Sequence, residues 1–237
     1  MCFSAEASFT VAAACAAAGG FSLMKCPSPR YLPLAFMPLG FAVQQAVEGV
    51  VWLQLGQSPD ATATGLFPAI FVFFATAFWP TYVPLAIHAE EHGPERRWTL
   101  DVLVAIGLVI SLAFLSKLFT SDTVAHVTDH HVRYTAQAEN TQTLKHWLFY
   151  KPFITGRDWI LVPYILSAVG SLFLSTLRPV RWFGALVAFA LLVVLVMDRK
   201  VLVSVWCFCA AAGSVMIVLA ILQARRNLAT TGELSVP

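Results

Sequence analysis

Two glutamines and a glutamate lie inside an apolar stretch of the sequence, FAVQQAVEGVVWLQL, which covers residues 41–55. In a helix, Gln44 and Glu48 share one face because they are four residues apart, and Gln45 lies beside them. A carboxylate in hydrocarbon is costly and normally faces the interior of a helical bundle, where it finds a partner. The spacing therefore predicts either a polar clasp between helices or a site for a ligand, an ion or a proton.

Residues from other parts of the chain are expected at the same depth in the membrane. They come from the first and last hydrophobic stretches and from the next turn of the same helix: Cys2, Ser4, Trp52, Ser204, Trp206 and Cys207. With the two glutamines and Glu48, they form the predicted lining of a ligand-binding pocket. Lys117, Tyr164 and Asp198 are expected nearer the interface, where lysines snorkel and tyrosines form an aromatic belt.

A second group of chemically capable residues is the histidine-rich stretch HVTDHHVRY. As a helix, it places His126 and His130 four residues apart on one face, with His131 adjacent. Imidazoles at this spacing can bind zinc or copper, but such a site needs a third or fourth ligand. The candidates for it are Asp122, His146 and Glu6. The alternative is that these are hydrated surface histidines without a metal.

The composition explains why these polar residues stand out. Of the 237 residues, 58% are hydrophobic and only 12% are charged, whereas a soluble domain has about 25% charged residues. Apolar runs about as long as the roughly 20 residues that cross a bilayer predict an all-α, polytopic membrane protein with one domain. Seven transmembrane helices are expected, at about residues 3–24, 32–55, 64–87, 99–118, 159–177, 182–197 and 201–222. The hydrophilic segment 119–158 is expected outside the membrane, on the extracytoplasmic side.

Basic residues in the short turns predict the orientation of the chain, because such turns stay on the cytoplasmic side. The turns after the first, third and fifth spans and the C-terminal tail hold Lys25, Arg30, Arg96, Arg97, Arg178, Arg181, Arg225 and Arg226. We therefore expect the N-terminus outside and the C-terminus in the cytoplasm, with the lipid bilayer as a partner. The basic residues are scattered between hydrophobic runs and form no basic patch, so the sequence gives no support for a nucleic-acid partner.

Two of the expected spans have unusual sequences. In the first, small residues recur every four positions and predict a face for close helix packing: Ser4, Ser8, Ala12, Ala16 and Gly20. In the third, Pro68, Pro80 and Pro84 predict a kinked helix. The carbonyl groups that the prolines leave unpaired must be satisfied by neighbouring helices or by water.

Four short motifs, MCFSAEASF, QQAVEGVVW, WPTYVP and SVWCF, resemble an uncharacterised family of bacterial multi-span membrane proteins. The resemblance extends from Met1 to about Ala211 and implies a location in the bacterial inner membrane. It marks the following residues: Cys2, Ser4, Ser8, Gln45, Glu48, Trp52, Trp79, Pro80, Ser204, Trp206 and Cys207. Cys209 departs from the family pattern, which has an aromatic residue there. The family has no established function to import.

The sequence thus supports three hypotheses about function. The leading one is a sensor or carrier that binds a small molecule or an ion in an outward-facing polar pocket near Glu48. The second is a membrane enzyme that uses a metal or the thiol of Cys2, although no H-E-x-x-H, P-loop or G-x-S-x-G motif is present. The third is a structural subunit of a larger membrane complex.

Overall fold

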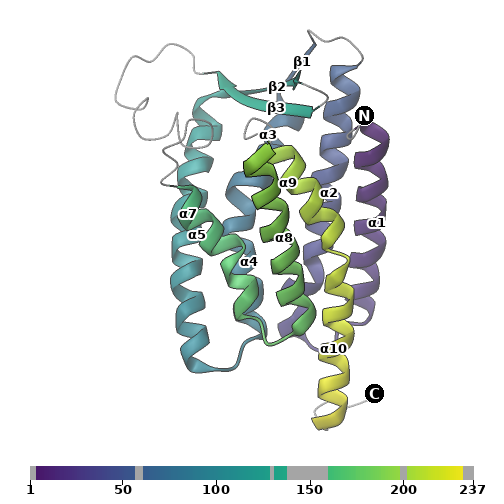
Figure 1. Ribbon diagram of the computed structural model, residues 1–237, viewed down its shortest axis with the longest axis vertical. Coiled ribbons are helices and arrows are strands. Elements are labelled where there is room, and N and C mark those ends of the chain that lie inside the picture. Colours follow the sequence, from purple (N-terminus) through teal and green to yellow (C-terminus); the bar gives the residue numbers. More distant parts are fainter. Residues whose placement is uncertain (1–3, 57–60, 129–130, 138–159, 198–201, 232–237) are drawn as a thin grey trace.

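The computed structural model describes residues 4–56, 61–128, 131–137, 160–197 and 202–231. Its helices form an elongated bundle with a small β-sheet at one end (Figure 1). In chain order the elements are α1 (Ala5–Met24), η1 (Pro29–Tyr31), α2 (Leu32–Leu55), β1 (Thr62–Thr64), α3 (Leu66–Phe73), η2 (Phe74–Phe78), α4 (Trp79–Glu90), α5 (Pro94–Thr120), β2 (Asp122–Thr128), β3 (His131–Gln137), α7 (Leu161–Ala168), η3 (Gly170–Leu174), α8 (Arg178–Met197), α9 (Leu202–Gly213) and α10 (Met216–Thr231).

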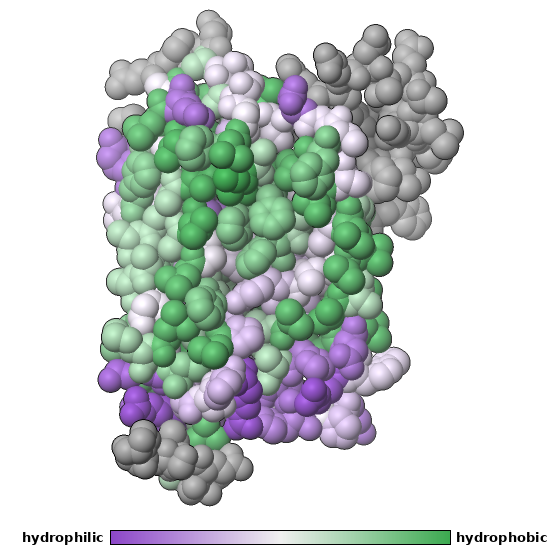
Figure 2. Space-filling model, turned by 180° about the vertical axis from the view of Figure 1, so that it is seen from behind, coloured by the Kyte–Doolittle hydropathy of each residue, from purple (hydrophilic) through white to green (hydrophobic). Residues whose placement is uncertain are grey.

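Several of these helices are suited to a membrane. In the described part of the chain, five helical segments are long and apolar enough to cross one: Ala5–Met24, Pro29–Leu55, Leu66–Glu90, Pro94–Thr120 and Trp206–Thr230. Figure 2 shows hydrophobic side chains over much of the rear face of the bundle, with hydrophilic ones gathered toward its ends. This distribution is typical of a multi-pass membrane protein.

Of the last three expected spans, the sixth is a single helix and the fifth and seventh each consist of two shorter helices. The fifth, at residues 159–177, contains two short helices, α7 and η3, while the sixth overlaps α8. The seventh is divided between α9 and α10 at Ser214, whose hydroxyl donates to the carbonyl of Ala211 at 2.7 Å. The thiol of Cys15 in α1 donates to the same carbonyl at 3.2 Å. Hydrogen bonds within the bundle thus satisfy the carbonyl groups at this break.

The sheet corrects the expectation of an all-α chain. It has the order β1-β2-β3, with both pairs antiparallel. The strands β2 and β3 lie in the segment 119–158, which was expected only to be outside the membrane. Ala125 pairs with both Ala63 and Tyr134, and the inner side of the sheet packs on the end of α2 through Val51 and Leu55. The sheet therefore covers the end of the bundle where α2 finishes.

The close-packing face of α1 also differs from the expected repeat of four. The residues of α1 that the structure buries are Ser8, Ala12, Cys15, Ala18, Gly19 and Ser22. Ala16, which was expected on this face, is exposed. The strict repeat is wrong because a helix has 3.6 residues per turn, so that its buried face drifts around the axis. At Gly19, a Cβ atom would lie 2.6 Å from Leu39 of α2, so close approach of the two helices requires glycine there.

The third expected span, whose prolines predicted a kink, is a continuous helical segment, Leu66–Glu90, in which the type of helix changes. A π-helical turn, η2, separates α3 from α4 just before Pro80, and prolines have no N–H to give to the preceding turn. Side chains of α5 and α7 supply the missing donors. The carbonyl groups of Ala75, Ala77 and Pro80 accept hydrogen bonds from Tyr164, Ser111 and Ser167, respectively. Neighbouring helices therefore satisfy the freed carbonyls, which confirms the expectation.

The turn between α4 and α5 is organised by a buried carboxylate, Glu91. Its Oε1 accepts hydrogen bonds from the backbone N–H groups of His92 and Gly93, both at 2.8 Å, and Arg96 lies 3.5 Å from its Oε2. Burial alone would raise the pKa of Glu91, but these N–H groups and the Arg96 guanidinium together hold it below its ordinary value of 4.5. The turn is therefore stabilised by the ionised form of Glu91.

This lowered pKa predicts a loss of stability in acid. Because the folded protein binds the proton less tightly than the unfolded chain, the contribution of Glu91 is complete above pH 4.5 and is lost as the pH falls through the lowered value. We expect the melting temperature of the wild type and that of Glu91→Gln to converge below about pH 4.5. Melting curves in detergent between pH 3.5 and 7 measure this, with the exposed Glu95→Gln as the control. A constant difference across this range would contradict it.

Candidate functional site

The polar residues of α2 are buried in the bundle. Gln44 and Gln45 have no exposed surface, and Glu48 is 1% exposed. Gln45 donates from Nε2 to Glu48 Oε2 at 3.2 Å, as the spacing of three residues on a helix allows. Gln44 Oε1 accepts from the indole N–H of Trp79 in α4 at 2.7 Å. The predicted group is therefore an interior site, with its two amides oriented by different partners.

The hydrogen bonds to Trp79 and Glu48 each use only one of the two polar atoms of the Gln44 and Gln45 side-chain amides. The indole N–H of Trp79 is only a donor, so it fixes Gln44 with its oxygen toward α4. The other atom of that amide, Gln44 Nε2, is buried and has no oxygen or nitrogen partner among the described residues, although the thiol of Cys207, a weak acceptor, interacts with this side chain. Gln45 Oε1 is also buried and has no partner among the described residues, because Nε2 of that side chain faces Glu48. A buried donor and a buried acceptor are thus available beside the carboxylate.

Tyr134 of β3 brings the sheet into this site. Its ring stacks on Phe71 of α3, with the ring centroids 4.6 Å apart. Its hydroxyl is buried and has no partner in the described part of the chain. Burial raises the pKa of Tyr134 well above its ordinary value of 10, and the nearby Glu48 and Cys207 raise it further. Tyr134 therefore stays a neutral phenol that can donate or accept a hydrogen bond beside Glu48.

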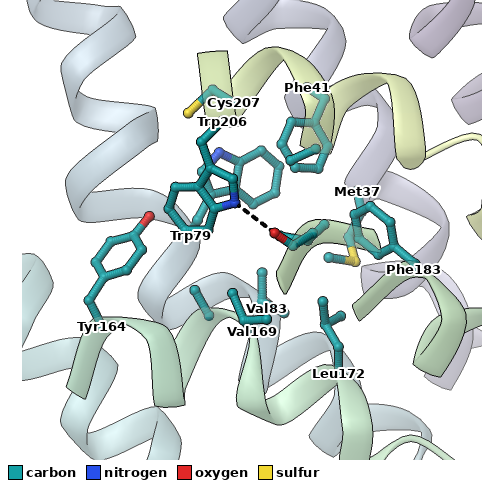
Figure 3. Close-up of a pocket in the computed structure, with 13 residues that line it drawn as sticks. Met37, Phe41, Trp79, Val83, Tyr164, Val169, Leu172, Phe183, Trp206 and Cys207 are labelled. Carbon is teal, nitrogen blue, oxygen red and sulfur yellow. Dashed lines mark hydrogen bonds between the residues drawn. The ribbon is translucent and has the colours of Figure 1, made fainter. Parts of the chain in front are cut away.

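An apolar cavity adjoins the polar group on the side of α4 and α9. Figure 3 shows its lining, to which Trp79, Tyr164, Trp206 and Cys207 contribute along with apolar residues of α2, α7 and α8. Its volume is about 30 Å³, and a single water needs about 10–15 Å³. Trp79 and Cys207 border both regions, because Trp79 bonds Gln44 and Cys207 lies near Glu48. The site thus has a polar part and an apolar part.

The polar atoms of the aromatic lining are already engaged. The hydroxyl of Tyr164 donates to the carbonyl of Ala75 at 2.6 Å. The indole of Trp206 donates to the carbonyl of Val187 at 3.1 Å, shown as the dashed line in Figure 3. The cavity therefore offers ring surfaces rather than hydrogen-bonding groups. Tyr164 is only 1% exposed, so its expected place in an interfacial aromatic belt is wrong.

The remaining residues of the predicted pocket have several different environments. Cys2 lies outside the described residues, as does Asp198, which was expected nearer the interface. Ser204 belongs to α9, but its side chain is not described. The hydroxyl of Ser4 accepts from the N–H of Ala7 at 3.2 Å and caps α1. Trp52 packs under the sheet, and its indole nitrogen is buried. The predicted pocket residues that the structure brings together are Gln44, Gln45, Glu48, Cys207 and, in the apolar cavity, Trp206.

The histidine-rich stretch is not a helix, which corrects the predicted metal-binding arrangement. His126 lies in β2 and His131 in β3, while His130 falls outside the described residues. The direct partner of His126 across the strands is Arg133. Burial lowers the pKa of His126, and the charge of Arg133 lowers it further. Because this stretch forms two strands, the helical spacing that suggested zinc or copper does not exist. In addition, a metal cation at His126 would be repelled by the guanidinium of Arg133 on the opposite strand.

Sequence reasoning missed Tyr134 as a site residue. The residues 122–128 and 131–137 are rich in β-branched and aromatic residues, and this is the ordinary signal of two strands joined by a short turn. Reading the stretch with a period of two would have placed Tyr134 on the same face of its strand as Val132, which the structure buries. The helical interpretation instead drew attention to the spacing of the histidines.

Comparison with known proteins assigns the chain to a group. The model of a family of unknown function (DUF6629) matches residues 1–233. The chain belongs to this family. No curated protein and no solved structure matches it significantly. The resemblance to an uncharacterised family is therefore confirmed, and the match includes α2, the sheet and α9, which together build the site of this DUF6629 chain.

Proposed function

We propose that this chain is a seven-span inner-membrane protein that binds a small molecule or an ion at the polar group around Glu48. The N-terminus and the sheet face outward in this proposal, and the C-terminus lies in the cytoplasm. The binding event serves a sensor or a carrier. The crossings are α1, α2, the continuous α3–η2–α4, α5, the pair α7 and η3, α8, and the pair α9 and α10.

The distribution of basic and aromatic residues supports this orientation. The turns that carry Lys25, Arg30, Arg96 and Arg178 lie at the end of the bundle opposite the sheet (Figure 1). Trp98 and Trp182, at the starts of α5 and α8, are 69% and 68% exposed. Exposed tryptophans beside basic residues are typical of a membrane interface, and the basic residues are typical of its cytoplasmic side.

One observation carries the proposal of binding. Gln44 Nε2, Gln45 Oε1 and the hydroxyl of Tyr134 are buried beside Glu48 without oxygen or nitrogen partners in the described part of the chain. Each buried polar group left unpaired costs about 1–3 kcal/mol, and native proteins rarely leave three together. A partner that these three atoms share would remove this cost. The aromatic cavity next to them provides the space for part of such a partner.

Glu48→Gln tests the proposal, because it keeps the shape of the side chain and replaces its carboxyl group by an amide. Native mass spectrometry of the purified protein, released from lipid nanodiscs, is expected to show a bound species on the wild type and none on Glu48→Gln. Glu95→Gln, at an exposed carboxylate of α5, and Gln54→Ala, at an exposed position of α2, are matched controls that keep the species.

Two results would contradict binding at Glu48. The first is a Glu48→Gln protein that folds and keeps the bound species. The second is a Glu48→Gln protein that fails to accumulate while both controls do, since Glu48 would then be a polar clasp between helices. Circular dichroism and the yield of the three variants separate these cases.

A further inference from the structure

Four arginines lie on two adjacent helices at the end of the bundle opposite the sheet. Arg178 and Arg181 are at the start of α8, and Arg225 and Arg226 are in α10. All four are exposed. The two helices pack against each other and run side by side toward this end, where α10 extends beyond the bundle (Figure 1). Their guanidinium groups therefore project from neighbouring helices at one end, far from the polar group around Glu48 on which the proposed function rests.

These arginines have no acidic partner in the part of the chain that the structure describes. Neither α8 nor α10 contains an aspartate or a glutamate. The ion pairs that join described residues lie elsewhere, at the end of α4 and the start of α5. The exposed surface of α8 and α10 thus has positive charge that no described carboxylate offsets, and it attracts anions.

An exposed apolar face continues from the basic end of each helix. On α8, Trp182 and Phe189 lie four and eleven residues after Arg178, and both are exposed. On α10, the exposed Leu219 lies seven residues before Arg226. Residues at these spacings share one face of a helix. Each helix therefore presents hydrocarbon surface within the bundle and a guanidinium group at its end.

This combination matches one class of molecule. A guanidinium group binds a phosphate through two parallel hydrogen bonds. Basic residues beside transmembrane helices on the cytoplasmic side are suited to the head groups of anionic lipids. A soluble anion would contact the arginines and leave the apolar faces uncovered, whereas a phospholipid covers both parts with its phosphate and its acyl chains.

We propose that the exposed surface of α8 and α10 binds an anionic phospholipid. The phosphate accepts hydrogen bonds from arginines of both helices. Trp182 lies at the interface, beside the head group, and the acyl chains cover the apolar faces. The placement of four guanidinium groups on two packed helices, next to exposed apolar faces and without a described acidic partner, carries this assignment.

Native mass spectrometry of the full chain in detergent, titrated with defined lipids, tests the proposal. Phosphatidylglycerol, which is anionic, is compared with phosphatidylcholine of the same acyl chains, which is zwitterionic. We expect the wild type to bind phosphatidylglycerol more tightly. Arg178→Gln combined with Arg181→Gln is expected to weaken that binding by about tenfold, toward the affinity for phosphatidylcholine, because two attractions to the phosphate are lost.

Arg97→Gln is the matched control. Arg97 is exposed at the same end of the bundle and precedes an exposed tryptophan, as Arg181 does, but Asp101 lies four residues later on its helix face. This variant should leave the affinity for phosphatidylglycerol unchanged. If the glutamine variant does not accumulate, Arg178→Lys with Arg181→Lys keeps the charge, and a smaller loss of about threefold is expected because an ammonium group cannot form the two parallel hydrogen bonds.

Four results would overturn the inference. The first is equal affinity of the wild type for the two lipids. The second is a glutamine variant that is folded by circular dichroism and keeps the wild-type affinity for phosphatidylglycerol. The third is an equal loss in Arg97→Gln, which would make the effect one of general charge at this end. The fourth is displacement of phosphatidylglycerol by free glycerol phosphate, because the arginines would then bind a soluble anion. None of these results concerns a species bound at Glu48, so this inference and the proposed function can fail separately.

Discussion

Gly107→Ala is expected to destabilise the folded protein by about 3 kcal/mol or more, because the new methyl group would collide with the backbone of another helix. Gly107 of α5 faces Pro80 of α4. An added Cβ would lie 2.6 Å from the carbonyl carbon of Pro80 and 2.7 Å from the hydroxyl oxygen of Ser167. The carbonyl group of Pro80, with which the new methyl group would collide, is the one that accepts the hydrogen bond from the hydroxyl of Ser167. The substitution therefore separates α4 from α5 or breaks that hydrogen bond.

The melting temperature and the yield of purified protein in detergent measure this effect. Gly20→Ala is the matched control, because a Cβ at Gly20 of α1 meets nothing within 4 Å. Alanine is favoured over glycine in a helix by up to about 1 kcal/mol, so this control should be neutral or slightly stabilising. If Gly107→Ala melted with the wild type, α4 and α5 would not be as close as the structure places them.

Trp79→Phe is expected to cost about 1–3 kcal/mol, because it leaves Gln44 Oε1 buried without a donor. Phenylalanine can keep the stacking on Phe41, where the ring centroids are 3.9 Å apart. What it loses is the 2.7 Å hydrogen bond from the indole N–H. Since Gln44 Nε2 already lacks an oxygen or nitrogen partner among the described residues, both ends of this amide would then be without one.

A double variant separates the hydrogen bond from the ring. Replacing both partners of a buried hydrogen bond by apolar groups can be nearly neutral, so Trp79→Phe with Gln44→Leu is expected to recover most of the lost stability. Trp98→Phe, at a residue that is 69% exposed, is the control for the loss of an indole. Melting temperatures of the wild type, Trp79→Phe, the double variant and Trp98→Phe show whether the lost stability comes from the hydrogen bond or from the ring. A double variant less stable than Trp79→Phe alone would mean that Gln44 has further partners that matter more.

Both predictions concern the same stretch of α4, where the third span meets its neighbours. The carbonyl of Pro80 accepts a hydrogen bond from Ser167 of α7, and the indole N–H of Trp79 donates to Gln44 of α2. The π-helical turn η2 lies directly before them. Such turns often occur at functional sites, and here the turn is next to the residue that links the polar group to the aromatic cavity.

The sequence by itself predicted that Glu48 and its two glutamines are buried in the interior of a helical bundle, and the structure buries all three. The reason is local: a carboxylate and two amides in an apolar helix of this length face the interior of a bundle, where they meet partners. The same kind of local argument predicted that carbonyl groups of the third span need donors from neighbouring helices, because a proline removes a hydrogen bond wherever it is placed. Neither conclusion needed to know which helices are neighbours.

Tertiary structure alone decided what surrounds that site. Tyr134 is far from Glu48 in the sequence, and it reaches the site only because β2 and β3 pair with β1 over the end of α2. The cavity between Trp79, Tyr164 and Trp206 depends likewise on how α4, α7 and α9 pack. Hydropathy and periodicity describe one segment at a time, whereas the contacts that complete this site join segments that are distant along the chain.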